Sequence, residues 1–294
     1  MSWQYGDGRI INSIGGFYEV QLPTLRVSCR ARGVFREQGI KPLPGDIVHI
    51  RYNTLDNTGY IEEVKVRKNT LLRPPVANLD QAAVVVSTKS PKFNGWGLDR
   101  MLIILEHLDI PTVIVVTKDD LDPKKAAEIK KIYSSIGYEV YTTRATIISP
   151  EELSEVFAGK ITALMGPSGV GKTSLINAIS PLELSTGTVS TKTSRGKHTT
   201  RHVELYPLGN EGYVFDTPGF SSLDLTEVFS DEVEIKDGFP EFRKLQHKCK
   251  FLGCVHDKEP ECAIKEALGK GEVHSDRYEN YLMFLEEIRS HRRY

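Results

Sequence analysis

Hydrophobic and polar residues alternate in several short segments of the first quarter of the chain. Between Gly8 and about Leu72, β-rich runs are separated by proline, glycine and asparagine: GFYEVQL, RVSCRARGVF, DIVHIRY and TGYIEEVKV. Alternation with a period of two is typical of strands with one buried face, and the residues between the runs favour turns. This spacing predicts a five-stranded small barrel of the OB type.

The pattern changes after Arg73-Pro74-Pro75, which we interpret as a linker because proline restricts both itself and the preceding residue. Continuous apolar runs follow, AAVVVST, TVIVVTK and ITALMGP, with helical stretches such as LDRMLIILEHL between them. Such runs are typical of strands buried on both faces of a parallel sheet, so the middle region is predicted to be a doubly wound α/β domain.

From about Ser222 the pattern becomes helical and charged, and it closes with the predicted helix RYENYLMFLEEIRSHRRY. The chain is therefore predicted to be a multidomain protein. We expect an OB-fold domain over 1–72, an α/β domain over 73–221 and a mainly helical domain over 222–294.

The composition fits this organisation. With 294 residues, 39% of them hydrophobic, the chain is long enough for two or three domains, and it contains no apolar run approaching the eighteen or so residues of a membrane span. The N-terminus MSWQYGDGRI lacks the features of a secretory signal, so we expect a cytoplasmic protein without membrane contact. In a reducing compartment, clustered cysteines among the four present are first considered as metal ligands.

A phosphate-binding loop is predicted at residues 166–173, GPSGVGKT, which fits G-x-x-x-x-G-K-[ST] between a strand over 161–165 and a helix over 174–179. Glycines let backbone N–H groups surround the β-phosphate, Lys172 neutralises the β- and γ-oxygens, and the Thr173 hydroxyl ligates Mg²⁺. The residues expected to bind nucleotide here are Gly166, Ser168, Gly169, Val170, Gly171, Lys172, Thr173 and Ser174.

Two loops that sense the γ-phosphate are predicted beyond this site. The sequence DTPG at 216–219 follows a strand over 213–215, where Asp216 is placed to act near Mg²⁺ and the Gly219 N–H to meet the γ-phosphate. The segment RGKHTTR at 195–201 occupies the position of switch I, and either Thr199 or Thr200 reaches the metal. A basic loop without order is the alternative interpretation of that segment.

Base recognition is predicted before the phosphate loop in the chain. Thr117, Lys118 and Asp120 resemble the N-K-x-D guanine motif, and the Asp120 carboxylate can accept two hydrogen bonds that adenine does not offer. Thr117 replaces the usual asparagine, which we expect to remove an amide that braces the loop; residues 142–146 are a weaker candidate for the second base loop. Guanine loops that precede the phosphate loop predict a circularly permuted GTPase.

A metal centre is predicted near the C-terminus. Cys249, Cys254, His256 and Cys262 form C-x4-C-x-H-x5-C, a complete set of ligands for one closed structural zinc site. Cys29 stands alone in a β-rich run and is predicted to be a core residue.

These motifs together resemble the circularly permuted ribosome small-subunit-dependent GTPase A family, across nearly the whole chain. The resemblance rests on DQAAVVVSTKSPKFN, TKDDL, GPSGVGKTSLINAI, RGKHTTR, DTPGF and CKFLGCVHDKEPECAIKEALGKGEV. It implies an OB-fold, GTPase and zinc-domain protein that hydrolyses GTP slowly alone and faster on the small ribosomal subunit, during late maturation of that subunit. It also implies binding of ribosomal RNA, GTP and GDP, with Mg²⁺ accompanying the GTP, and we expect a monomer.

The family likeness also suggests a catalytic group. Phe220 stands where many GTPases carry a glutamine that orients the attacking water, and the resemblance makes His198 the candidate for that task. Contact of His198 with RNA or solvent is the alternative.

Other interpretations remain open at this stage. Residues 1–72 contain ten basic and seven acidic residues, an excess of three positive charges that fits either oligonucleotide binding or an ordinary solvated surface. A GTP-gated RNA-binding checkpoint, in which hydrolysis only releases the protein, is a rival function. An ATP-dependent P-loop enzyme is disfavoured by Asp120.

Overall fold

The computed structural model describes residues 3–71, 75–143, 150–179, 204–208, 211–216 and 224–291. These residues form two compact units. One contains the described residues between positions 1 and 81, 149 and 164, and 172 and 218, and the other contains those between 82 and 148, 165 and 171, and 219 and 294. The predicted domain boundaries near 72 and 221 fall in segments outside the described residues, so they stay predictions.

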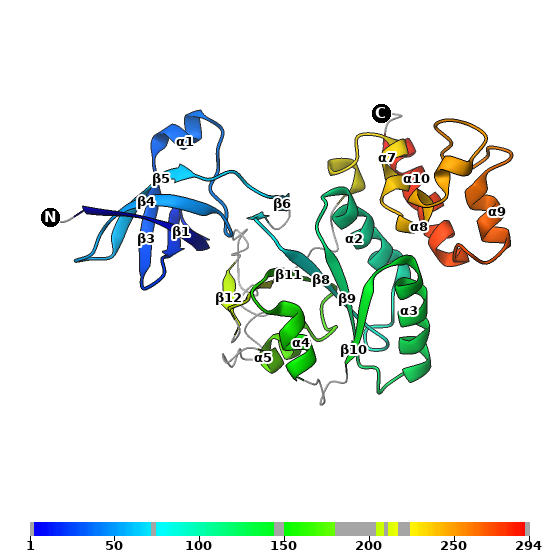
Figure 1. Ribbon diagram of the computed structural model, residues 1–294, viewed down its shortest axis with the longest axis horizontal. Helices are drawn as coiled ribbons and strands as arrows, with labels where there is room; N and C mark the ends of the chain where they lie inside the picture. The colour runs from blue at the N-terminus through cyan, green and yellow to red at the C-terminus, as the bar shows by residue number, and fades with distance from the viewer. Residues whose placement is uncertain are drawn as a thin grey trace. The chain divides into compact units, whose positions relative to one another are not determined.

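The N-terminal segment forms a closed barrel with the strand order β1-β2-β3-β5-β4 (Figure 1). Its strands are β1 (Trp3–Ile14), β2 (Phe17–Gln21), β3 (Arg26–Ala31), β4 (Ile47–Asn53) and β5 (Thr58–Val64). Buried and partly buried positions alternate along β4, as expected for a strand with one face in a core. Cys29 is fully buried among the apolar side chains of the barrel, which confirms its prediction as a core residue.

Two details of the barrel differ from the sequence-based prediction. The run RVSCRARGVF was predicted as strand throughout, but β3 ends at Ala31 and helix α1 (Gly33–Glu37) follows, because Phe35 packs into the barrel core from this short helix. Strand β1 begins at Trp3, before the first predicted run. The apolar alternation of β1 is interrupted by Gly6, Asp7 and Gly8, so the sequence pattern does not indicate a strand there.

A six-stranded sheet follows, with the order β10-β9-β8-β11-β13-β12. The strands are β8 (Gln81–Ser87), β9 (Thr112–Thr117), β10 (Glu139–Thr143), β11 (Ile161–Met165), β12 (Leu205–Pro207) and β13 (Tyr213–Asp216). β8, β9 and β10 are parallel to one another, β11 is parallel to β13, and β12 runs antiparallel to β13. Every residue of β8 and β11 is buried, as predicted from their continuous apolar sequences.

Helices alternate with these strands, and local signals set their ends. They are α2 (Gly95–His107), α3 (Pro123–Ile136), α4 (Pro150–Phe157) and α5 (Lys172–Ile179). The Asp122 side chain accepts a hydrogen bond from the Lys125 N–H at the start of α3, and Gly137 ends that helix with a φ of 116°. A two-stranded ribbon, β6 (Thr70–Leu71) with β7 (Val76–Ala77), precedes β8.

The C-terminal region is helical, as predicted. It contains η2 (Leu225–Glu227), α7 (Glu232–Asp237), α8 (Pro240–Arg243), η3 (Gln246–Lys248), α9 (Ala263–Gly269) and α10 (Ser275–His291). Among the described residues, no helix is both long enough and apolar enough to span a bilayer.

A buried ionic network joins α2 to the C-terminal helices. The Arg277 guanidinium on α10 bonds Asp99 of α2, and its Nε lies 2.6 Å from a Glu241 carboxylate oxygen on α8. Asn280 and Tyr133 donate to the same Asp99 carboxylate at 2.7 and 2.9 Å. Burial raises the pKa of the Asp99 carboxyl more than the nearby Arg277 charge lowers it. For the Arg277 guanidinium, the Asp99 and Glu241 carboxylates raise the pKa more than burial lowers it.

Candidate nucleotide site and metal centre

The phosphate loop leaves β11 through a backbone that only glycine tolerates. Gly166 has a φ of 138°, and a Cβ atom there would lie 2.2 Å from the carbonyl oxygen of Val85. Val170 is buried, which anchors the loop, whereas Ser168 and Gly169 are exposed. The loop therefore presents its tip to solvent on a fixed base.

Helix α5 starts two residues earlier than predicted, at Lys172. Lys172 and Thr173 thus lie in its first turn and are half-buried, while Leu175, Ile176 and Ile179 turn into the core. Backbone N–H groups in the first turn of a helix have no partner within the helix and favour an anion. This arrangement of loop, lysine and helix start is suited to binding phosphate.

The predicted guanine loop is tied directly to the phosphate loop. Thr117 is buried at the end of β9, and its hydroxyl lies 2.5 Å from the carbonyl oxygen of Val170 and 3.1 Å from that of Val86. Threonine at position 117 lacks the amide of the usual asparagine, and its hydroxyl links the loop to the carbonyl oxygens of Val170 and Val86 instead. The sequence could not indicate this contact, since its partner lies 53 residues away.

The next residue adds a second link. Lys118 has a φ of 58°, and its ammonium group donates to the carbonyl oxygens of Ser90 and, at 2.8 Å, of Gly169. The Thr88 hydroxyl donates to the Lys118 carbonyl oxygen at 2.6 Å, which fixes the backbone of the loop. Asp120 is exposed beyond these contacts. Its carboxylate is therefore accessible for a base.

The remaining nucleotide residues are only partly described. Asp216 ends β13 as predicted, but its side chain lies outside the described residues. His198, Thr199, Thr200 and Gly219 also lie outside them, as do residues 144–149 after β10. The roles assigned to these positions stay predictions.

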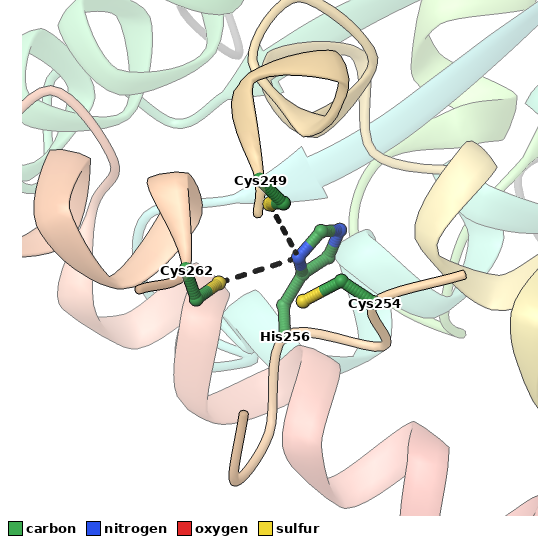
Figure 2. Close-up of side chains that lie close together, drawn as sticks. All are labelled: Cys249, Cys254, His256 and Cys262. Atoms are coloured by element: carbon green, nitrogen blue, oxygen red, sulfur yellow. Dashed lines mark hydrogen bonds between the residues drawn. The ribbon is translucent and has the colours of Figure 1, made fainter. Parts of the chain in front are cut away.

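The four predicted zinc ligands converge on one point (Figure 2). Their ligand atoms all lie within 4.8 Å of one another, and Cys254, His256 and Cys262 are buried. The Nδ1 atom of His256 faces two sulfurs, at 3.6 Å from Cys249 and 3.4 Å from Cys262. Tetrahedral zinc, with Zn–S of about 2.3 Å and Zn–N of about 2.0–2.1 Å, requires nitrogen and sulfur about 3.6 Å apart. The residues therefore fit a closed Cys₃His zinc site with Nδ1 as the nitrogen ligand.

Burial shifts the pKa values of two of these ligands. Burial raises the pKa of the Cys254 thiol to about 12 and lowers the pKa of His256 to about 4 in the protein without metal. A neutral imidazole is ready to bind a metal ion, whereas the thiol has to release its proton when zinc binds.

The loop that carries Cys254 and His256 is held by residues that the sequence analysis did not single out. Tyr278 on α10 donates to the His256 carbonyl oxygen at 2.6 Å, Tyr281 donates to that of Val255, and Lys236 on α7 donates to that of Cys254 at 3.1 Å. The Phe242 ring meets the His256 ring edge to face, with centroids 5.7 Å apart. The C-terminal helices thus position the ligand loop through its backbone.

Comparison with known proteins matches this architecture. A family model described as RsgA GTPase matches residues 64–226, and one described as RsgA N-terminal domain matches residues 7–61. Small ribosomal subunit biogenesis GTPase RsgA of Shouchella clausii (strain KSM-K16) is 45% identical over 293 residues, which cover 98% of this chain and 99% of that protein. The protein of the same name from Streptococcus pyogenes serotype M6 (strain ATCC BAA-946 / MGAS10394) is 46% identical over 289 residues, covering 97% and 96%.

Two crystal structures share the fold over nearly the full length. YloQ, a circularly permuted GTPase, is 40% identical with a TM-score of 0.81, covering 98% of this chain and 96% of that one. YjeQ from Thermotoga maritima is 36% identical with a TM-score of 0.82, covering 97% and 99%. These likenesses confirm the predicted fold class and the permuted order of the GTPase motifs.

Proposed function

Because the chain belongs to the RsgA GTPase family and is a GTP hydrolase of small ribosomal subunit biogenesis, we propose that the small subunit stimulates its hydrolysis of GTP and that it binds ribosomal RNA. The likeness to small ribosomal subunit biogenesis GTPases over nearly the whole chain carries this proposal, and the contact between the guanine loop and the phosphate loop supports GTP as the substrate. Thr117 and Lys118 bond the carbonyl oxygens of Val170 and Gly169, so base recognition and phosphate binding form one rigid unit. A nucleotide that fits both loops is a guanine nucleotide.

Each predicted residue then has a role toward GTP. Asp120 accepts from the guanine base, and Lys172 neutralises the β- and γ-phosphates. Thr173 and either Thr199 or Thr200 would hold Mg²⁺, with Asp216 acting nearby. Mg²⁺ supplies positive charge to the phosphate oxygens when GTP binds. Gly219 and the amides of residues 166–171 donate N–H groups to the phosphates.

Catalysis is proposed to depend on the subunit. Phe220 cannot orient a water molecule, so hydrolysis by the free protein is slow, on the order of 10⁻⁴ to 10⁻² s⁻¹ for GTPases that lack a stimulating partner. His198 is proposed to position the attacking water when the protein is bound to the subunit.

Roles are also proposed for the barrel and for the zinc-binding region. We propose that the barrel contacts ribosomal RNA, that one structural zinc ion holds the Cys249–Cys262 loop, and that the protein acts as a cytoplasmic monomer in late maturation of the subunit.

The experiment measures GTP turnover by the full-length protein alone, with small subunits and with large subunits, together with co-sedimentation in GDP and in a non-hydrolysable GTP analogue. We expect stimulation by small subunits only, and stronger co-sedimentation with the GTP analogue. Lys172→Ala is the control that removes phosphate binding without touching the barrel or the zinc loop. Equal turnover with and without small subunits would disprove the proposal.

A further inference from the structure

A row of alternating aromatic and arginine side chains follows the outer wall of the closed barrel around its circumference. Strand pairing places Phe17 opposite Arg30, Arg30 opposite Tyr60, Tyr60 opposite Arg51, and Arg51 opposite Tyr5. Residues opposite each other in a ladder point to the same face. These five residues, called the aromatic–arginine row below, therefore cross all five strands in the order β2-β3-β5-β4-β1.

The row is open to solvent, and each of its two arginines lies over one ring of the row. Tyr5, Phe17 and Tyr60 are 61%, 44% and 41% exposed, although outward positions of a barrel normally carry polar residues. The Arg30 guanidinium lies 4.6 Å from the Phe17 ring, and that of Arg51 lies 5.8 Å from the Tyr60 ring. Adjacent strands are about 4.8 Å apart, so the row measures about 19 Å along the curved wall of the barrel.

The rings of Trp3 and His49 lie beside the row. Trp3 lies on β1 two residues before Tyr5, with the Arg51 guanidinium 4.8 Å from its ring and the Tyr60 ring 6.2 Å away. The Tyr5 ring stacks on the His49 imidazole with an angle of 11° between planes. An open hollow between these side chains is lined by Tyr5, Arg30, His49, Arg51 and Tyr60.

The charges on this face favour stacking over phosphate binding. Glu62 pairs with both Arg32, at 2.5 Å, and Arg51, at 3.6 Å, and Asp7 pairs with His49 at 2.6 Å. Glu62 offsets part of the positive charge of Arg32 and Arg51, while the aromatic rings of the row stay exposed. Flat aromatic and guanidinium groups stack on unpaired bases, whereas bases inside a duplex are already stacked on each other.

We propose that the aromatic–arginine row binds unpaired nucleotides of RNA by stacking their bases. The inference rests on the proposed function that the barrel contacts ribosomal RNA, and it names the surface and the kind of RNA. The row extends from β2 and β3 over β5, β4 and β1, and so it is wider than the face of strands 2 and 3 that OB folds commonly use. Three rings separated by arginines provide places for about three bases.

The experiment uses the full-length protein with Trp96→Phe, which leaves Trp3 as its single tryptophan. Ten-nucleotide oligouridylate and oligoadenylate are added, and a ten-base-pair RNA duplex serves as the comparison. We expect the single strands to quench Trp3 fluorescence and the duplex to leave it unchanged. The slope of log affinity against log salt should correspond to about two phosphates or fewer, at about 0.7 per phosphate for single strands.

Substitutions at Tyr60 separate stacking from simple apolar packing. Tyr60→Phe keeps the ring and should bind oligonucleotide like the parent, while Tyr60→Leu keeps apolar bulk without the ring and should bind about ten-fold more weakly. Leu55→Ala, in the exposed turn between β4 and β5, is the matched surface control. Thermal unfolding of each variant verifies that the barrel is intact.

Co-sedimentation of the same variants with small subunits distinguishes the possible failures. If the parent binds subunits but Tyr60→Leu binds oligonucleotide as well as Tyr60→Phe does, the row is not an RNA site and the proposed function stands. If Tyr60→Leu loses subunit binding without losing oligonucleotide binding, the row contacts protein and the inference is wrong. If the parent does not bind subunits at all, the proposed function itself fails.

Discussion

Removing the Thr117 hydroxyl is the most direct test of whether the guanine loop holds the phosphate loop in its binding conformation. Thr117→Val keeps the shape of the side chain and deletes only the hydroxyl, which bonds the carbonyl oxygens of Val170 and Val86. A hydroxyl has one proton, so the shorter contact with Val170 is the main donor bond and the other is shared.

The expected magnitude follows from burial. Val170 is 1% exposed, so its carbonyl oxygen gains no water when the hydroxyl is lost. Leaving one buried acceptor unsatisfied costs about 1–3 kcal/mol in the free energy of unfolding. We expect a similar loss in GDP affinity, about five-fold to a hundred-fold, because the phosphate loop is no longer held in its binding conformation.

The assay pairs denaturant unfolding with titration of a fluorescent GDP analogue. Thr112→Val is the matched control, because Thr112 begins the same strand and its hydroxyl donates to Ile110 at 2.9 Å, away from the phosphate loop. Equal GDP affinity in Thr117→Val and Thr112→Val would refute the brace, even if both variants lose stability.

Four further outcomes follow from the same structure. Asp120→Asn should weaken GDP binding by about 100-fold or more and favour xanthine nucleotides, as measured by competition; unchanged selectivity for guanine would remove Asp120 from base recognition. Cys254→Ser should lose stoichiometric zinc and destabilise the C-terminal region, whereas equal zinc by elemental analysis would reject the ligand set. His198→Ala should lower subunit-stimulated turnover about ten-fold or more with GTP affinity unchanged, and normal stimulated turnover would make this histidine a bystander. Arg277→Met should cost about 3–5 kcal/mol in unfolding free energy, because Asp99 and Glu241 are then buried without a cation; a loss below about 1 kcal/mol would show that the network relaxes.

Local motifs were predicted well because the residues that define each motif are close together in the sequence. The glycines and lysine of residues 166–173 stand together in the chain, and the strand over 161–165 was predicted with its observed ends. The zinc ligands lie within fourteen positions, so spacing alone brought Cys249 and Cys262 together with the two ligands between them. Buried parallel strands were recognised from apolar runs that have no polar interruption.

Contacts between distant segments could not be predicted in the same way. Strand register or helix packing brings the residues of three such features together. They are the Thr117 brace, the hydrogen bonds from Tyr278 and Tyr281 to the zinc loop, and the row from Phe17 to Tyr5. A count of charges over the first 72 residues described the barrel surface as weakly basic. It missed the ordering of rings and guanidinium groups, because that order runs across the strands and not along them.

The partners in the buried network around Asp99 are synthesised at different times. Arg277 lies 178 positions after Asp99, which is about 10–35 s of translation at roughly 5–20 residues per second. During that interval α2 has its buried carboxylate but not the cation that neutralises it. We therefore expect α2 to complete its packing only after Arg277 has been made, so that a chain stalled before Arg277 should remain sensitive to protease at α2.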